Sequence, residues 1–132
     1  MSGPESNFSA WLRKAEHDLL NIENNLAAKE IPWDTVCFHA QQAAEKVLKA
    51  FLVHCGRDLT KTHDLVALLA HCVECESDLA PLESDCRMLT SFGVAARYPD
   101  DLFEPGEGDG RDVIAAAYRV RDKIFTFLPK NP

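Results

Sequence analysis

Arg57 and His63 are the two residues whose types and spacing could support catalysis. They open and close the segment RDLTKTH (57–63), in which an aspartate directly follows the arginine. A histidine can transfer a proton as a general acid or base, and an arginine can hold a phosphate and stabilise the charge that develops on it. This chemistry needs no metal ion. The spacing alone carries little weight, because one such match is expected by chance in a chain of this composition. The alternative is that His63 only orders the start of a helix.

A second group of polar residues could contact phosphate. On a helix over residues 35–55, side chains three and four positions apart share one face. That face carries His39, Gln42, Lys46 and Lys49. Lys61 adds another positive charge, so this part of the chain is basic although the net charge of the whole chain is −7. The acidic total disfavours non-specific nucleic-acid binding, and the face could meet a phosphate, an acidic partner or only solvent.

Gln41 lies on the apolar side of the same helix. A buried amide without partners costs on the order of 1–3 kcal/mol, so Gln41 needs a polar neighbour. Asp18, at the edge of the apolar stripe of the preceding helix, is the expected partner. Together they form either a satisfied polar core or the wall of a polar pocket.

The five cysteines predict neither a zinc site nor a redox motif. The segment HCVEC (71–75) holds one CxxC, only Cys86 lies nearby, and a zinc site needs about four ligands. We expect mostly small buried hydrophobic cysteines, with no metal and no cofactor.

Helical periodicity runs through the chain, and no segment alternates as a strand would. The apolar spacing predicts helices over 7–29, 35–55, from Thr62 through Cys72, over 78–92 and over 111–128, with a loop over 93–110. Ser6 or Asn7, Asp34 and Thr62 are the expected N-caps, and Gly56 is the expected left-handed stop. The helix over 35–55 is apolar around half its circumference and should be central. The sequence therefore predicts an all-α, antiparallel up-and-down bundle of four to five helices in a single domain, 1–132, with its core over about 8–128.

The composition is that of a globular protein, with 46% hydrophobic and 27% charged residues. No apolar run is long enough to span a membrane, and the N-terminus lacks the pattern of a signal peptide. We therefore expect a cytoplasmic protein that does not associate with membranes.

Four segments, in order, resemble the HEPN-domain family, named for a nucleotide-binding domain shared by higher eukaryotes and prokaryotes. They are AEHDLL (15–20), CFHAQQAAEKVLKAFLVHCG (37–56), KTHDL (61–65) and ARYPD (96–100). The similarity extends over about residues 8–128. It implies a bundle of four to five helices that is commonly a homodimer.

The resemblance also implies a choice of roles. Small bacterial members often accompany a minimal nucleotidyltransferase in two-component toxin–antitoxin modules. Some members are metal-independent ribonucleases with an Arg-x(4–6)-His motif, and others are non-catalytic binders. We expect a nucleotide- or RNA-associated binding component with a nucleotidyltransferase partner. The alternatives are a metal-independent endoribonuclease that uses Arg57 and His63, and a non-catalytic structural interaction module.

Arg97 and Tyr98, in the fourth segment, could also bind a ligand. Arginine pairs with phosphate and tyrosine stacks on bases. Asp100 and Glu104 follow closely and would repel phosphate. The alternative is a structural role, in which Arg97 pairs with an acid and Pro99 fixes the turn.

Overall fold

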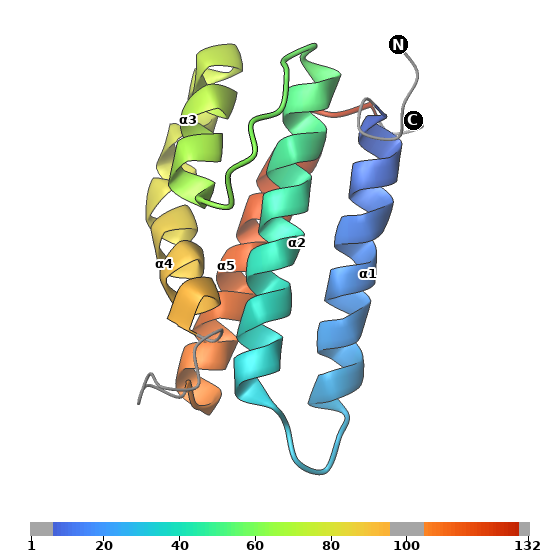
Figure 1. Cartoon of the computed structure of the whole chain (residues 1–132), viewed down its shortest axis with the longest axis vertical. Helices are drawn as coiled ribbons and strands as arrows, with labels where there is room; N and C mark the ends of the chain where they lie inside the picture. Colours follow the sequence, from blue (N-terminus) through green and yellow to red (C-terminus); the bar gives the residue numbers. More distant parts are fainter. Residues whose placement is uncertain (1–6, 96–104, 130–132) are drawn as a thin grey trace.

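The computed structural model describes residues 7–95 and 105–129, and all regular structure in these ranges is helical (Figure 1). The elements are α1 (Phe8–Leu26), α2 (Trp33–His54), α3 (Leu65–Cys75), the 3₁₀ helix η2 (Ser77–Leu82), α4 (Glu83–Ala95) and α5 (Glu107–Phe125). The all-α prediction is confirmed. No helix in these ranges combines the length and the apolar character needed to cross a membrane.

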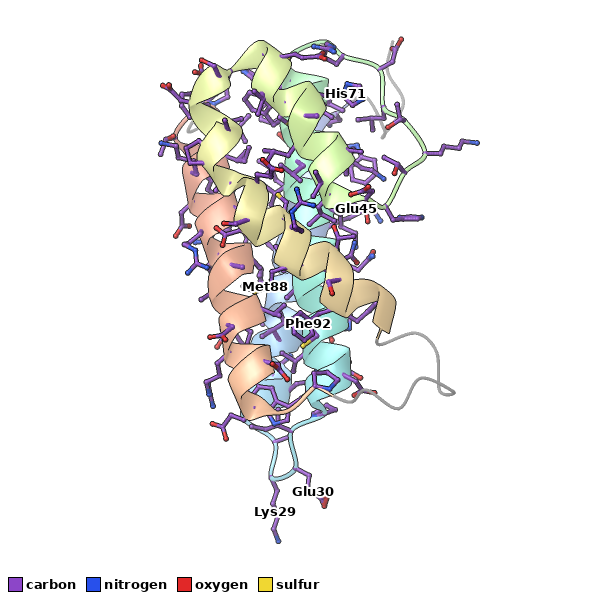
Figure 2. The ribbon with its side chains drawn as sticks, turned by 90° about the vertical axis from the view of Figure 1, so that its left-hand side faces the viewer. Lys29, Glu30, Glu45, His71, Met88 and Phe92 are labelled. Carbon is purple, nitrogen blue, oxygen red and sulfur yellow. The ribbon has the colours of Figure 1, made fainter. Side chains whose placement is uncertain are left out.

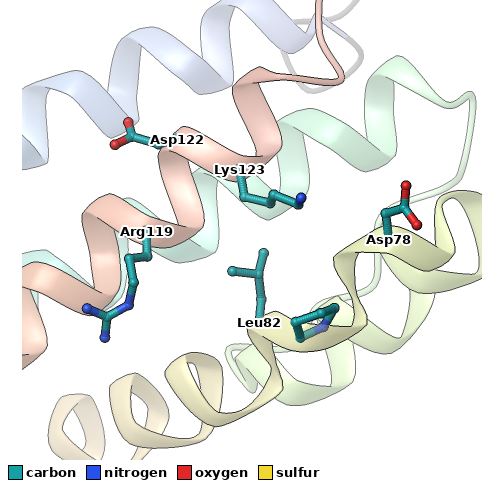
Figure 3. A pocket seen from close by; sticks show the side chains of 6 residues that line it. Asp78, Leu82, Arg119, Asp122 and Lys123 are labelled. Atoms are coloured by element: carbon teal, nitrogen blue, oxygen red, sulfur yellow. The ribbon is translucent and has the colours of Figure 1, made fainter.

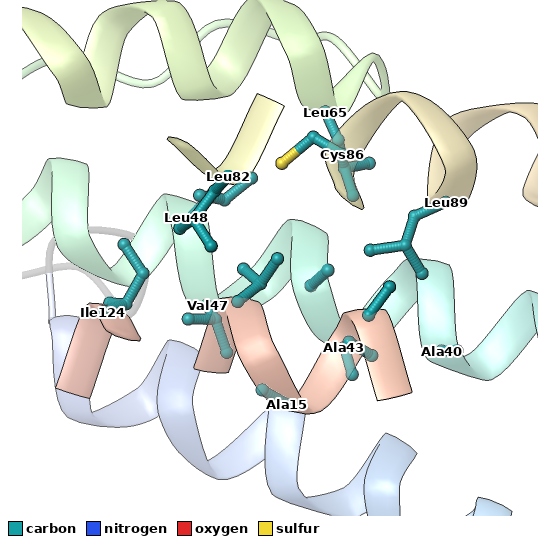
Figure 4. Packing of buried hydrophobic residues seen from close by; sticks show 14 of the residues in the cluster. Ala15, Ala40, Ala43, Val47, Leu48, Leu65, Leu82, Cys86, Leu89 and Ile124 are labelled. Atoms are coloured by element: carbon teal, nitrogen blue, oxygen red, sulfur yellow. The ribbon is translucent and has the colours of Figure 1, made fainter. Parts of the chain in front are cut away.

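α2 is the central helix, as its wide apolar arc predicts. It contacts α1, α3, α4 and α5, and 13 of its 22 residues are buried. Ala40, Ala43 and Ala44 are almost fully buried, and their small side chains let neighbouring helices approach closely. Figure 4 shows Val47 and Leu48 of α2 among core side chains of the surrounding helices. Each fully buried aliphatic side chain contributes roughly 1.5–3 kcal/mol, so this helix holds the bundle together.

Helix direction alternates along the chain except at α3. After α2 the segment 55–64 returns along the bundle, and α3 then runs in the same direction as α2 (Figure 1). His63 consequently lies beside Glu45 in the middle of α2, whereas Cys75 lies beside Arg57, just beyond the end of α2. In Figure 2, Glu45 lies near the start of α3 and His71 toward its other end. The C-terminal ends of α2 and α3 are therefore neighbours.

Gly56 makes the reversal after α2 possible. Its φ is 77°, in the left-handed region that favours glycine. The backbone N–H of Gly56 donates to the carbonyl of Val53 (3.0 Å), and that of Arg57 donates to the carbonyl of Leu52 (2.9 Å). This pair of bonds is the Schellman arrangement that ends helices at glycine, so the predicted stop at Gly56 is confirmed.

Two helix starts differ from the prediction. The N-cap of α2 is Pro32, and Asp34 lies inside the first turn. The N-cap of α3 is Asp64, whose carboxylate accepts from the N–H groups of Val66 (2.9 Å) and Ala67 (3.4 Å). The hydroxyl of Thr62 instead accepts from the N–H of Asp64 (3.1 Å). A carboxylate two residues further along therefore takes the capping role expected of Thr62.

Other helix boundaries also differ from the prediction. α1 ends at Leu26 rather than at 29, and the predicted helix over 78–92 is divided into η2, which contains Pro81, and α4. α5 spans Glu107–Phe125 rather than 111–128. Residues 93–95 and 107–110, which were predicted as part of a loop, are therefore helical.

Gly110, in the first turn of α5, leaves room for the side chain of Trp33. A Cβ at this position would lie 2.2 Å from Cε3 of Trp33, so the indole occupies the space of the missing side chain. The guanidinium of Arg111 lies 5.4 Å from the centroid of the same ring. Trp33 thus packs the start of α2 directly against the backbone of α5.

Candidate functional site

Two buried carboxylates organise the polar side chains around α2. Asp18, on α1, is 6% exposed and Glu45, on α2, is 4% exposed. Burying a carboxylate is costly unless it is paired and hydrogen-bonded. Each of the two binds one lysine and one histidine.

The first group, the Asp18 cluster, joins α1 to α2. Oδ1 of Asp18 lies 2.9 Å from Nδ1 of His39, and Oδ2 lies 2.6 Å from Nζ of Lys46. Both partners are largely screened from solvent. The charge of Lys46 is therefore matched within the protein.

The second group, the Glu45 cluster, joins α2 to the segment before α3. Its carboxylate accepts from Nζ of Lys49 (2.9 Å) and from Nε2 of Gln41 (3.2 Å), and lies 3.0 Å from Nδ1 of His63. Nε2 of Gln41 also approaches the carbonyl of His63 (3.3 Å), while its Oε1 accepts from Gln42 (2.8 Å). The partners of Gln41 are therefore Glu45, Gln42 and His63. The expected contact with Asp18 was wrong, because Asp18 is occupied by His39 and Lys46.

Lys49 lies inside the protein rather than on a solvated face. It is 8% exposed, and its Nζ lies 5.5 Å from the centroid of the Trp11 ring of α1. Together Lys46 and Lys49 balance Asp18 and Glu45, so the polar face of α2 has no excess positive charge when its histidines are neutral. Across residues 7–95 and 105–129, no fully buried side-chain nitrogen or oxygen lacks a hydrogen-bond partner.

His63 has the features of an oriented proton acceptor. Its side chain is 66% exposed, while Nδ1 contacts the buried carboxylate of Glu45. A carboxylate at one ring nitrogen fixes the orientation and the tautomer of a histidine, which leaves the other nitrogen to react. Glu45 was not predicted as a site residue from the sequence. Its spacing of four from both Gln41 and Lys49 was the available signal.

Arg57 belongs to a different part of the molecule. Its guanidinium donates to Oε1 of Glu74 and to Sγ of Cys75 (3.2 Å), both at the end of α3. His63 lies just before the start of α3, and a helix of 11 residues rises roughly 15 Å. Within one chain the structure therefore does not bring Arg57 and His63 together.

The remaining candidate residues are partly described. Lys61 is exposed, and it takes part in none of the ion pairs found among the described residues. Arg97 and Tyr98 lie outside the described residues.

The cysteines divide into two kinds. Cys37, Cys72 and Cys86 are buried, and burial raises the pKa of Cys37 to about 11 and that of Cys86 to about 12. Cys55 and Cys75 are exposed, so three of the five cysteines are buried, in agreement with the expectation that most would be. The CxxC is thus divided between core and surface, and no three His, Cys, Asp or Glu side chains in the described ranges are arranged to hold a metal ion.

A separate open pocket of about 480 Å³ lies between η2 and α5 (Figure 3). Six residues line it: Asp78, Pro81, Leu82, Arg119, Asp122 and Lys123. Arg119 already donates two hydrogen bonds to Asp85 (3.1 and 2.8 Å), so its charge is matched. The pocket holds none of the sequence-predicted site residues.

The model of the HEPN-domain family matches residues 8–126, which is most of the chain. No curated protein and no solved structure matches the chain.

Proposed function

Because this chain belongs to the HEPN-domain family, we propose that it is a non-catalytic binding component of a toxin–antitoxin-type module. Its partner in this proposal is a minimal nucleotidyltransferase, and the module acts in the cytoplasm with this chain as a homodimer. The separation of Arg57 from His63 is the observation that supports a non-catalytic role, whereas the partner and the homodimer rest on the family to which the chain belongs. Arg57 is anchored to Glu74 near the C-terminal end of α3, and His63, just before the start of α3, is anchored to Glu45 of α2. In this arrangement the two residues brace the segment 56–64 against the bundle.

The matched charges on α2 support a protein partner over an extended RNA surface. Phosphate binding draws its affinity from free cationic groups, and Lys46 and Lys49 are already paired with buried carboxylates. Contact with a nucleotide would fall to the exposed Lys61 and to the partly exposed Gln42. Because few side chains would contact it, such a nucleotide ligand would be small.

Co-purification tests the partner. A tagged form of this chain would be co-expressed with a minimal nucleotidyltransferase encoded beside it, and the mixture separated by size-exclusion chromatography with light scattering. We expect one complex of fixed stoichiometry, and a dimer when this chain is alone. Separate elution of the two proteins, or a genome without such a neighbouring gene, would contradict the partner.

A ribonuclease assay tests the absence of catalysis. With a chelator present, the wild-type protein should leave RNA intact at the rate of a His63→Ala variant. Cleavage that resists the chelator and disappears in His63→Ala would refute a non-catalytic role.

The second candidate is a metal-independent endoribonuclease, and the contact of His63 with Glu45 is the observation that favours it. Since Arg57 is remote from His63 within one chain, activity would require Arg57 of one copy and His63 of another to meet in a dimer. Mixing inactive Arg57→Ala and His63→Ala variants would then restore activity, because some mixed dimers retain one intact pair. If the wild type is active, both variants are inactive and their mixture also stays inactive, a site shared between two copies is excluded.

A further inference from the structure

The neighbouring ends of α2 and α3 place two exposed cysteines together. Cys55 is the C-cap residue of α2, and Cys75 is the last residue of α3. Both residues are exposed, and Cys75 is among the neighbours that raise the pKa of the Cys55 thiol, so the two side chains lie close together. The guanidinium of Arg57, two residues after Cys55, donates to Sγ of Cys75 (3.2 Å). This proximity arises because α3 runs parallel to α2 and ends beside it.

We propose that Cys55 and Cys75 form a dithiol site that a hydroperoxide oxidises to an intramolecular disulfide. The site is independent of the proposed binding function. Reducing cellular compartments keep such pairs as thiols, and disulfides that form there are usually transient and regulatory. The two cysteines would therefore respond to oxidant rather than carry a permanent cross-link.

The surroundings of the two sulfurs differ, and this gives the reaction an order. Partial burial and the hydrogen bond with Cys75 raise the pKa of Cys55 to about 11, so this thiol keeps its proton at neutral pH. Sγ of Cys75 instead accepts a hydrogen bond from the guanidinium of Arg57 (3.2 Å), which also donates to Glu74. The thiolate is the nucleophilic form of a cysteine, and Cys55 is the thiol of the pair that is held protonated. Cys75 is therefore the sulfur that attacks first.

The reaction balances with a hydroperoxide as the only oxidant. The sulfur of Cys75 attacks the terminal peroxide oxygen and the O–O bond breaks. The other oxygen leaves with the proton of the thiol, as an alcohol from an organic hydroperoxide or as water from hydrogen peroxide. The sulfenic acid formed on Cys75 is then attacked by the sulfur of Cys55. The S–S bond forms, and hydroxide leaves as water with the proton of Cys55. The two thiols lose two electrons, and the peroxide gains them.

The disulfide would act on the segment that carries the candidate site residues. It would close a covalent ring over residues 55–75, which includes Arg57, Lys61 and His63. It would also consume the sulfur to which Arg57 donates, and so weaken one of the two anchors of that side chain. Oxidation would thereby link the two ends of the segment 55–75 covalently, and it would also weaken the anchoring of the Arg57 side chain.

Peptide mass spectrometry tests the proposal on the full-length reduced protein. Treatment with one equivalent of hydrogen peroxide should remove two hydrogen atoms from the monomer, and digestion without reductant should yield one cross-linked peptide pair that joins Cys55 to Cys75. Cys55→Ser should stop at a sulfenic acid on Cys75 that dimedone traps. Cys37→Ser, in the buried core, is the matched control and should still form the cross-link.

Three results would overturn it. One is a protein that keeps all five thiols after treatment at peroxide concentrations that oxidise glutathione. Another is an intermolecular dimer joined through Cys75 on a non-reducing gel. The third is a cross-link to Cys72 in place of Cys55. Circular dichroism of each variant shows that it is folded, and reversal by dithiothreitol distinguishes the disulfide from over-oxidation.

Discussion

Replacing Glu45 with glutamine should strongly destabilise the protein, because it leaves the ammonium of Lys49 buried without its counter-ion. Removing one partner of a buried ion pair costs about 3–5 kcal/mol. The ring of Trp11, 5.5 Å from Nζ of Lys49, offsets part of this. We therefore expect the free energy of unfolding to fall by about 3 kcal/mol, the lower end of this range. Domains of this size are stable by only about 5–15 kcal/mol, so the change is large.

Glu83→Gln is a closely matched control. Glu83 and Arg87 form a second ion pair at the same spacing of four, and both side chains are more than half exposed. Exposed pairs at this spacing contribute about 0.3–0.5 kcal/mol. The two variants therefore make the same chemical change and differ mainly in burial.

Urea unfolding followed by circular dichroism measures both variants, with the free energy of unfolding extrapolated to water. A Glu45→Gln/Lys49→Met double variant should recover at least half of the loss, because no unpaired charge remains buried. Equal losses for Glu45→Gln and Glu83→Gln, or a double variant no more stable than Glu45→Gln alone, would refute the account of the Glu45 cluster.

Four further substitutions test the packing and the helix ends by thermal or urea unfolding. Gly110→Ala should destabilise the protein by about 1–3 kcal/mol, since its Cβ would collide with Trp33. Gly108→Ala, with open space at its Cβ, should stabilise the protein slightly. A Gly108→Ala variant less stable than Gly110→Ala would contradict the contact between Gly110 and Trp33. Asp64→Ala should cost about 1 kcal/mol through loss of the N-cap of α3, and an unchanged midpoint would show that Thr62 can replace it. Gly56→Ala should cost about 1 kcal/mol because its φ is 77°, and a neutral effect would mean that the turn adjusts.

The sequence predicts features that depend on periodicity better than those that depend on contacts between helices. The central position of α2 follows from how many of its faces are apolar, and the stop at Gly56 follows from local backbone chemistry. The cap of α3 was misassigned because Thr62 and Asp64 are both good capping residues. Only the conformation of the chain decides between them.

The candidate site was harder to predict, because its partners lie on different helices. Periodicity places Lys49 beside other polar residues of α2, but it does not reveal that α1 and the segment 56–64 enclose that face. Whether Gln41 contacts Asp18 or Glu45 depends on the rotation of α1 against α2. The spacing of Arg57 and His63 likewise gives no hint that a helix separates their partners.

The placement of the two tryptophans provides an optical reporter for each long interface of α2. Trp33 packs on the backbone of α5 at Gly110, and Trp11 of α1 lies over Lys49. The chain has no other tryptophan. A Trp11→Phe variant would therefore report through fluorescence on the docking of α5, and Trp33→Phe would report on that of α1. Stopped-flow refolding of the two variants would show whether the two sides of the bundle assemble together or in sequence.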